Sequence, residues 1–330
     1  MVTNLVSSNF TKTLILRGTI AQGITRKTDM TDQQLLFGED FEDFDLSKVE
    51  ERIWALESKG DLAGAERIAV DAVTKTRAAQ NGARLEVDPL LTSLETRANF
   101  YARTGNFVAA KADYLEAVSL VAGKSGNEGV LSRLYGELGY LMESAEKIEE
   151  ATDAYERALE QLGRLREPVV VDVVRLSNNL AFLHSANDDF DQAETLLLKA
   201  LKLAHAKLGL ADDDTTGVCN NVGTLYQKAG HFDQAREMHI MALEGREKKN
   251  GKNNPDVAQS HGNLAAVYAQ EGDLEDAKEH FESSVEIYQK LGDEYAEDLD
   301  AVAGNYLQVL AALGDQERVA EIEKLLLPEG

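Results

Sequence analysis

Residues 272–277 read Gly-Asp-Leu-Glu-Asp-Ala, and residues 230–235 read Gly-His-Phe-Asp-Gln-Ala, which is a related hexapeptide 42 positions earlier. The hexapeptide recurs, at this offset or close to it, at 60–65, 105–110, 146–151, 188–193 and 314–319. Similarity at a fixed period is typical of repeat architectures, in which each small unit stacks on its neighbours. The stretch therefore predicts the fold of most of the chain.

Further columns of the repeat indicate that each unit is a helical hairpin. A small residue stands seven positions after the end of six of the hexapeptides, at Ala72, Ala117, Ala158, Ala200, Ala242 and Ser284. Apolar residues at i, i+3 or i+4 and i+7 define one face of each helix, and a glycine at the end of the first helix permits a left-handed turn. The four prolines fall between or after the hairpins, at Pro89, Pro168, Pro255 and Pro328. We expect an all-α fold of about seven hairpins over residues 46–328, with a solvated last helix near 316–327 as an end cap.

The pattern of Leu, then Gly or Ala, then Tyr, and later Ala, a large residue and a small one resembles the tetratricopeptide repeat. The 42-residue spacing is similar to that of the kinesin light chain type, as in Asn-Asn-Pro-Asp-Val-Ala-Gln-Ser-His-Gly-Asn-Leu-Ala-Ala-Val-Tyr at 253–268. The resemblance implies a right-handed superhelical solenoid. It covers 90–328 well and 46–80 weakly. The chain lacks the sustained heptads that precede the repeats in true kinesin light chains, so motor association is not implied.

Composition narrows the class of partner. The chain has 330 residues, with 34 Lys and Arg against 58 Asp and Glu and a net charge of −24. Nucleic acid and anionic membrane surfaces both attract basic proteins, so neither is expected as a partner. Cys219 is the single cysteine, which precludes an intrachain disulfide and fits a reducing, cytoplasmic location.

Residues 1–45 differ from the rest, and we expect them to be a disordered leader. Within 1–29, four basic residues oppose one acid, Asp29. This stretch is either an organelle transit peptide, which would change the location, or upstream sequence before a true start at Met30. The second interpretation is favoured. The acidic aromatic stretch 37–45 is either a peptide that docks into a groove or, as favoured, a solvated lead-in to the first helix.

The candidate binding residues lie on the first helix of successive hairpins. Four asparagines recur every 42 residues, at Asn179, Asn221, Asn263 and Asn305. In the tetratricopeptide family this position faces the concave groove. A carboxamide both donates and accepts hydrogen bonds, so a row of them can bind the backbone of an extended peptide. The alternative is that each asparagine bonds the adjacent repeat and stiffens the array. Both interpretations stay open.

Basic residues accompany this column. The stripe through each asparagine and its counterparts in two earlier hairpins comprises 24 positions, of which one is acidic. We therefore expect a neutral to mildly basic groove that binds an extended peptide segment of a partner protein, which could be acidic. Arg175 and Lys228, helped by Arg133, would contact its carboxylates.

No motif indicates catalysis. The chain contains neither a phosphate-binding GxxxxGK[ST] loop nor HExxH, and one cysteine cannot form a zinc knuckle. His231, His239 and Cys219 are interpreted as packing or surface residues. We expect no enzyme activity, no cofactor and no metal site, and a non-catalytic interaction scaffold. The alternatives are a regulatory peptide-sensing repeat protein, or an enzyme that uses the solenoid surface.

Overall fold

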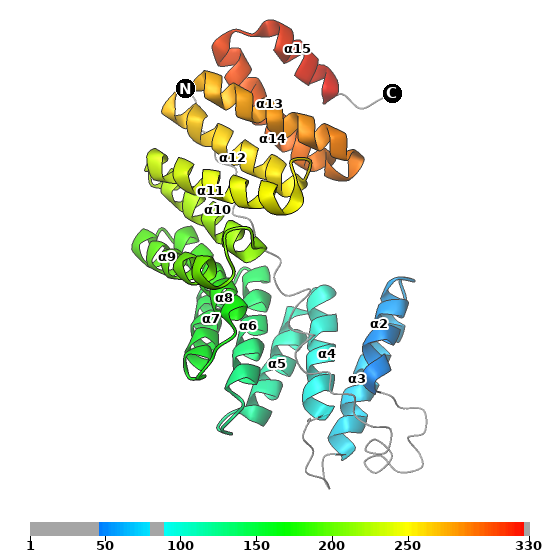
Figure 1. Ribbon diagram of the computed structural model, residues 1–330. Coiled ribbons are helices and arrows are strands. Elements are labelled where there is room, and N and C mark those ends of the chain that lie inside the picture. The colour runs from blue at the N-terminus through cyan, green and yellow to red at the C-terminus, as the bar shows by residue number, and fades with distance from the viewer. Residues whose placement is uncertain (1–45, 80–88, 327–330) are drawn as a thin grey trace. The chain divides into compact units, whose positions relative to one another are not determined.

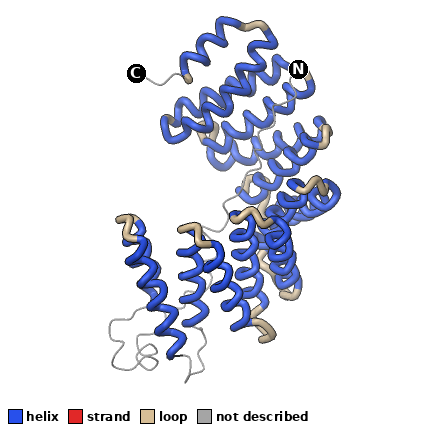
Figure 2. The backbone as a smooth tube through the Cα atoms, turned by 180° about the vertical axis from the view of Figure 1, so that it is seen from behind, coloured by secondary structure: helices blue, strands red, loops and turns tan. Residues whose placement is uncertain are grey.

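The computed structural model describes residues 46–79 and 89–326, and within them the chain is helical, with no β-strand (Figure 1, Figure 2). Fourteen α-helices of this described part follow one another as hairpins. The predicted all-α repeat fold is therefore confirmed. The leader 1–45, with its alternatives at Met30 and 37–45, and Pro328 lie outside the described residues.

The chain divides after Pro168 into two compact units. The described part of the N-terminal unit, residues 46–168, has three hairpins after a short 3-10 helix, η3 (Leu46–Lys48). Its helices are α2 (Val49–Glu57), α3 (Leu62–Ala79), α4 (Pro89–Arg103), α5 (Phe107–Val121), α6 (Glu128–Ser144) and α7 (Ile148–Gly163). Each helix packs against the next one along the chain.

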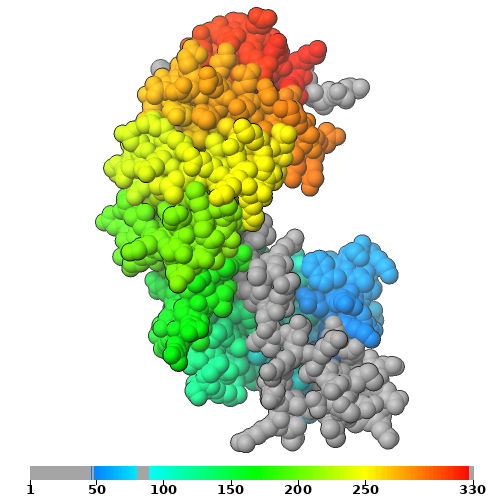
Figure 3. Space-filling model, in the orientation of Figure 1, coloured from blue at the N-terminus to red at the C-terminus, as the bar shows by residue number. Residues whose placement is uncertain are grey.

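The described part of the C-terminal unit, residues 169–326, has four hairpins, which follow one another as bands from green to red in Figure 3. Its helices are α8 (Val170–Ala186), α9 (Phe190–Lys207), α10 (Asp213–Lys228), α11 (Phe232–Asn250), α12 (Pro255–Glu271), α13 (Leu274–Leu291), α14 (Ala296–Leu313) and α15 (Gln316–Leu325), with a 3-10 helix, η4 (Asp293–Tyr295), before α14. The last helix buries Ile322 alone, as expected of an end cap. Pro255 opens α12, where the missing N–H costs nothing.

The hairpin turns have the left-handed geometry that the repeated glycine predicts. Residues at five of the seven turns are glycines with positive φ, at Gly60, Gly105, Gly230, Gly272 and Gly314. The other two turns place Glu146 and Asp188 at φ 58°, a region that side chains with a Cβ disfavour. The geometry is therefore imposed by the stacking of the hairpins even where glycine is absent.

Small residues let the two helices of a hairpin approach closely. In the N-terminal unit, a Cβ on Gly139 of α6 would stand 2.5 Å from ring carbons of Tyr155 on α7. In the C-terminal unit, a Cβ on Gly223 of α10 would stand 2.8 Å from the ring of His239 on α11. Both rings are fully buried, so each glycine is paired with the large residue opposite it.

None of the helices in the described ranges is both long and apolar enough to span a bilayer.

Candidate binding face on the inner helices

The first helices of the C-terminal hairpins form one layer. In this unit α8 contacts α10, α10 contacts α12, and α12 contacts α14. We call these four the inner helices, and α9, α11, α13 and α15 the outer helices. The inner helices each carry one of the predicted asparagines, Asn179, Asn221, Asn263 and Asn305.

Two of the four asparagines join neighbouring inner helices through buried hydrogen bonds. The Nδ2 of Asn221 donates to the Oδ1 of Asn178 on α8 at 2.7 Å. The Nδ2 of Asn263 donates to the Oδ1 of Asn220 on α10 at 2.5 Å. All four side chains are buried, and we call the two bonds the asparagine ladder. Asn221 and Asn263 are therefore hydrogen-bonded to the adjacent repeat, as in the second of the two interpretations. Contact of the asparagine column with a peptide stays a prediction.

The two end asparagines of the column are only partly buried. Asn179 lies on α8, the first inner helix. Asn305 lies on α14, where the ladder would need an acceptor 43 residues earlier, and that residue is Gly262. Among the described residues Asn305 therefore has no ladder bond, and its carboxamide stays available at the surface of the inner layer.

The accepting asparagines were missed by sequence reasoning, although the sequence holds a signal for them. Asn178 and Asn220 stand directly before the predicted Asn179 and Asn221 as Asn-Asn pairs. The first asparagine of each pair, Asn178 or Asn220, accepts a hydrogen bond from the next repeat. In the second pair, Asn221 also donates a hydrogen bond to the preceding repeat. A doubled asparagine is thus the pattern for a ladder that continues in both directions.

The predicted arginines are engaged in ion pairs with neighbouring helices. The Nε of Arg175 on α8 lies 2.7 Å from Asp214 Oδ1 on α10. In the N-terminal unit, the Nη2 of Arg133 on α6 lies 2.6 Å from Glu95 Oε1 on α4. A partner carboxylate would compete with these acids, which the sequence analysis did not consider. Lys228, at the end of α10, is exposed.

A carboxyl group takes the place of the asparagine column on α6. Glu137 stands 42 residues before Asn179 and one turn after Arg133. Burial raises the pKa of Glu137 to about 7, with Glu95 raising it further and Arg133 opposing the shift. Burial also raises the pKa of Glu95 itself. This part of the N-terminal unit is therefore a carboxyl pair that shares one arginine.

The cysteine and the histidines of the sequence analysis behave as packing or surface groups. Cys219 is buried, and burial raises the pKa of its thiol to about 12, which suits a core residue and not a nucleophile. His239 is fully buried and His231 exposed. Over the described ranges, no group of three or more His, Cys, Asp or Glu side chains is arranged to hold a metal ion.

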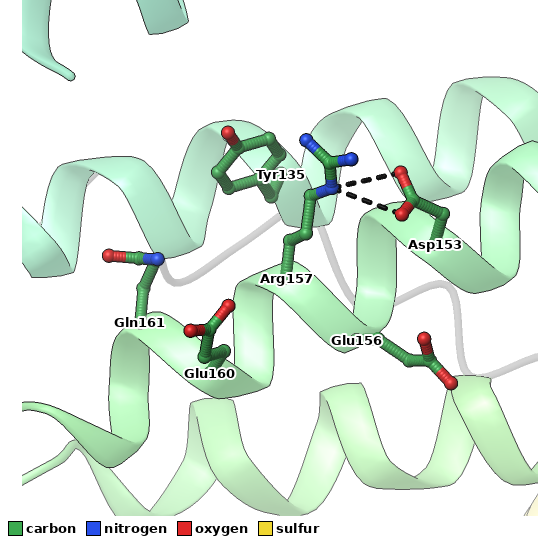
Figure 4. A pocket seen from close by; sticks show the side chains of 6 residues that line it. All are labelled: Tyr135, Asp153, Glu156, Arg157, Glu160 and Gln161. Carbon is green, nitrogen blue, oxygen red and sulfur yellow. Dashed lines mark hydrogen bonds and ion pairs between the residues drawn. The ribbon is translucent and has the colours of Figure 1, made fainter.

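A shallow depression of about 560 Å³ lies on the N-terminal unit, and none of the predicted residues lines it (Figure 4). Tyr135 of α6 lines it, together with Asp153, Glu156, Arg157, Glu160 and Gln161 of α7. The Nε of Arg157 points at Asp153, 2.9 Å from its Oδ2, while its guanidinium lies 5.8 Å from the centre of the Tyr135 ring. The basic group of the depression is thus already paired within the same helix.

The comparison with protein families agrees with the repeat. Residues 172–248, 218–290 and 256–324 match the family model of the tetratricopeptide repeat. Residues 172–324 are therefore tetratricopeptide repeats. Their fold is shared with kinesin light chain-like structures, and proteins built from such repeats are commonly interaction scaffolds, generally without enzyme activity.

Several solved structures share the fold of the chain. BtubC (BKLC) from P. vanneervenii is 22% identical over 67% of this chain and 89% of that one, with a TM-score of 0.60. A putative kinesin light chain from Podosopora anserina is 20% identical over 63% of this chain and 99% of that one, with a TM-score of 0.54. A Rap protein complexed with competence and sporulation factor is 13% identical over 85% of this chain and 75% of that one, with a TM-score of 0.53. No curated protein matches the chain.

Proposed function

We propose that the chain is a non-catalytic scaffold that binds an extended segment of a partner protein along the inner helices of its C-terminal unit. The observation that carries the proposal is the asparagine ladder. Its buried hydrogen bonds hold α8, α10 and α12 in register, so that the exposed residues beside them repeat at a fixed spacing. A face fixed before binding loses little conformational entropy when it binds.

The groups beside the ladder suit a peptide backbone. Gln270 on α12 and Asn305 on α14 are partly exposed, and Gln308 on α14 is exposed. Their carboxamides donate and accept at once, which matches the alternating N–H and C=O groups of an extended chain. Asn179 on α8 is partly exposed too and would meet the segment at the other end of the layer.

Charge makes a smaller contribution to this proposal. Lys228 is exposed at the end of α10, where it would attract an acidic side chain of the segment. Arg175 would share such a group with Asp214, and in the N-terminal unit Arg133 would share one with Glu95. The net charge of −24 disfavours nucleic acid and anionic membranes as the partner.

Two charge reversals, one on an inner helix and one on an outer helix, test the proposal. A displayed library of extended peptides is selected against the full chain, and the affinity of a selected peptide is then measured for two variants. Lys228→Glu changes the inner layer, whereas Lys199→Glu makes the same change on the exposed surface of outer helix α9. We expect Lys228→Glu to weaken binding about tenfold, which is ~1.4 kcal/mol, and Lys199→Glu to leave it unchanged. Loss of binding in Lys199→Glu alone, or in neither variant, would contradict the proposal.

A further inference from the structure

Two histidine rings meet between α12 and α13 in the C-terminal unit. The Nδ1 of His261 on α12 lies 3.0 Å from the Nδ1 of His280 on α13, and the ring centres are 5.2 Å apart. The two residues are 19 positions apart and match no ligand motif, so the sequence alone does not reveal the pair. Both side chains are partly buried, which leaves a route to solvent.

Neighbouring side chains hold the His280 ring in place. Tyr268 of α12 stacks on it with ring centres 5.5 Å apart and planes 9° from parallel. The guanidinium of Arg236 on α11 lies 5.5 Å from the centre of the Tyr268 ring and forms an ion pair with Glu271 at 2.6 Å. Ligand side chains that are fixed in advance by such contacts bind a metal without an added ordering cost.

The contact between the two rings is a hydrogen bond, in which one Nδ1 donates its proton and the other Nδ1 accepts it. One ring therefore already presents an Nδ1 lone pair toward its neighbour. The other ring presents a lone pair as well once its proton stands on Nε2 instead of Nδ1.

We propose that His261 and His280 form a two-imidazole site for a divalent transition metal ion, with Cu²⁺ bound most tightly. Two nitrogens that lie about 2.0–2.1 Å from one ion, at a square-planar or tetrahedral angle, are about 2.8–3.4 Å apart. The observed 3.0 Å falls within this range. Cu²⁺ leads the order of affinity for nitrogen ligands among the common divalent ions. Water completes the coordination.

The charges around the pair also favour a cation. Asp276 and Glu279 on α13 act electrostatically on His280, whereas Lys252, before α12, acts on His261 with the opposite sign. When the ion binds, the ring that donates in the hydrogen bond loses its Nδ1 proton to solvent and takes one up on Nε2, so that both rings present an Nδ1 lone pair. The ion then links α12 to α13 and stabilises the folded chain, because the two rings are brought together only in the folded state.

The test is a Cu²⁺ titration of the full chain, followed by electron paramagnetic resonance. His280→Phe keeps a ring against Tyr268 but removes the nitrogen, and His261→Gln removes the other ring. His205→Phe, on the exposed surface of α9, is the matched control, and circular dichroism checks that each variant folds. Copper bound elsewhere on the chain remains in the pair variants and is subtracted.

We expect one Cu²⁺ per chain coordinated by two imidazole nitrogens. Removal of either ring should lower the affinity of this site for Cu²⁺ by more than ~10–100-fold, which is the usual loss when a residue that only supports a metal ligand is removed. His205→Phe should bind Cu²⁺ as tightly as the native chain. Bound metal should raise the unfolding temperature of the native chain and of His205→Phe only. Native affinity in a folded His280→Phe or His261→Gln, or a signal from one imidazole in the native chain, would overturn the proposal. Neither result bears on partner binding by the inner helices.

Discussion

The same position of the repeat carries different chemistry in the two units. In the C-terminal unit it is an asparagine on all four inner helices, and on α6 of the N-terminal unit it is Glu137. The asparagines are neutral at any pH, and two of them donate buried hydrogen bonds to the preceding inner helix. Glu137 is a titratable group whose pKa is raised to about 7.

The residue just before this position decides which arrangement forms. Asn178 and Asn220 supply the acceptors of the ladder, whereas Gly136 precedes Glu137 and has no side chain to accept a bond. In the N-terminal unit the link between first helices is instead the ion pair of Arg133 with Glu95. The repeat thus fixes where a side chain stands, while the neighbouring helix determines its partner and its charge.

Replacing Glu137 by glutamine is expected to give the largest effect. The pKa of Glu137 is about 7 in the folded chain, against 4.5 for an ordinary glutamate side chain, so the folded state holds its proton more tightly. Its contribution to stability is complete below pH 4.5 and is lost as pH rises through 7, which amounts to about 3 kcal/mol by pH 7.5. Urea unfolding from pH 4.5 to 7.5 should show this loss in the native chain and not in Glu137→Gln. A parallel pH dependence in both proteins would show that Glu137 is not the cause.

His239 in the C-terminal unit should show the opposite pH dependence. Burial lowers its pKa from 6.5 to about 3, and neither ring nitrogen has a hydrogen-bond partner. The folded state therefore resists protonation, and stability is lost as pH falls below 6.5, by about 2 kcal/mol at pH 5. His239→Phe should remove this part of the acid sensitivity in urea unfolding, whereas His205→Phe at an exposed site should not. Equal acid sensitivity in the two variants would refute the assignment.

The ladder itself should contribute less than these ionisable groups. Asn263→Ala removes the donor to Asn220 and leaves a buried acceptor without that bond, so we expect a loss of about 1–2 kcal/mol. Asn305→Ala changes the same column where Gly262 replaces the acceptor, and should cost no more than about 0.5 kcal/mol. Equal losses of unfolding free energy in urea would mean that the hydrogen bond is not what distinguishes the two sites.

The smallest expected effect concerns the turns that lack glycine. Glu146 and Asp188 both adopt φ 58°, one in each unit. Glycine at position 146 should relieve the left-handed strain and stabilise the chain by roughly 0.5–1 kcal/mol, while Asp188→Gly should gain less because aspartate tolerates this region better. A small rise in the unfolding midpoint would support this ranking, and a fall in Glu146→Gly would exclude strain at that turn.

The fold was predictable from the sequence because the repeat is a local pattern. The hexapeptide that ends at Ala277, the glycine turns and the small residues opposite large ones are all visible along the chain. The partners of the charged groups were not predictable from the sequence, because a stripe of residues on one helix does not show which side chains of the next helix lie opposite it. Arg175 meets Asp214 and Arg133 meets Glu95 across 39 and 38 residues, slightly less than one repeat. His261 and His280 are brought together by the packing of one hairpin, which no short motif encodes.

The central claim is that a partner segment lies along the inner helices of the C-terminal unit. Photo-crosslinking of a selected peptide to the full chain, with mass spectrometry of the linked residues, tests it most directly. The account predicts crosslinks on α8, α10, α12 and α14, at or beside Asn179, Lys228, Gln270 and Asn305. Crosslinks confined to the outer helices α9, α11 and α13, or to the N-terminal unit, would contradict it.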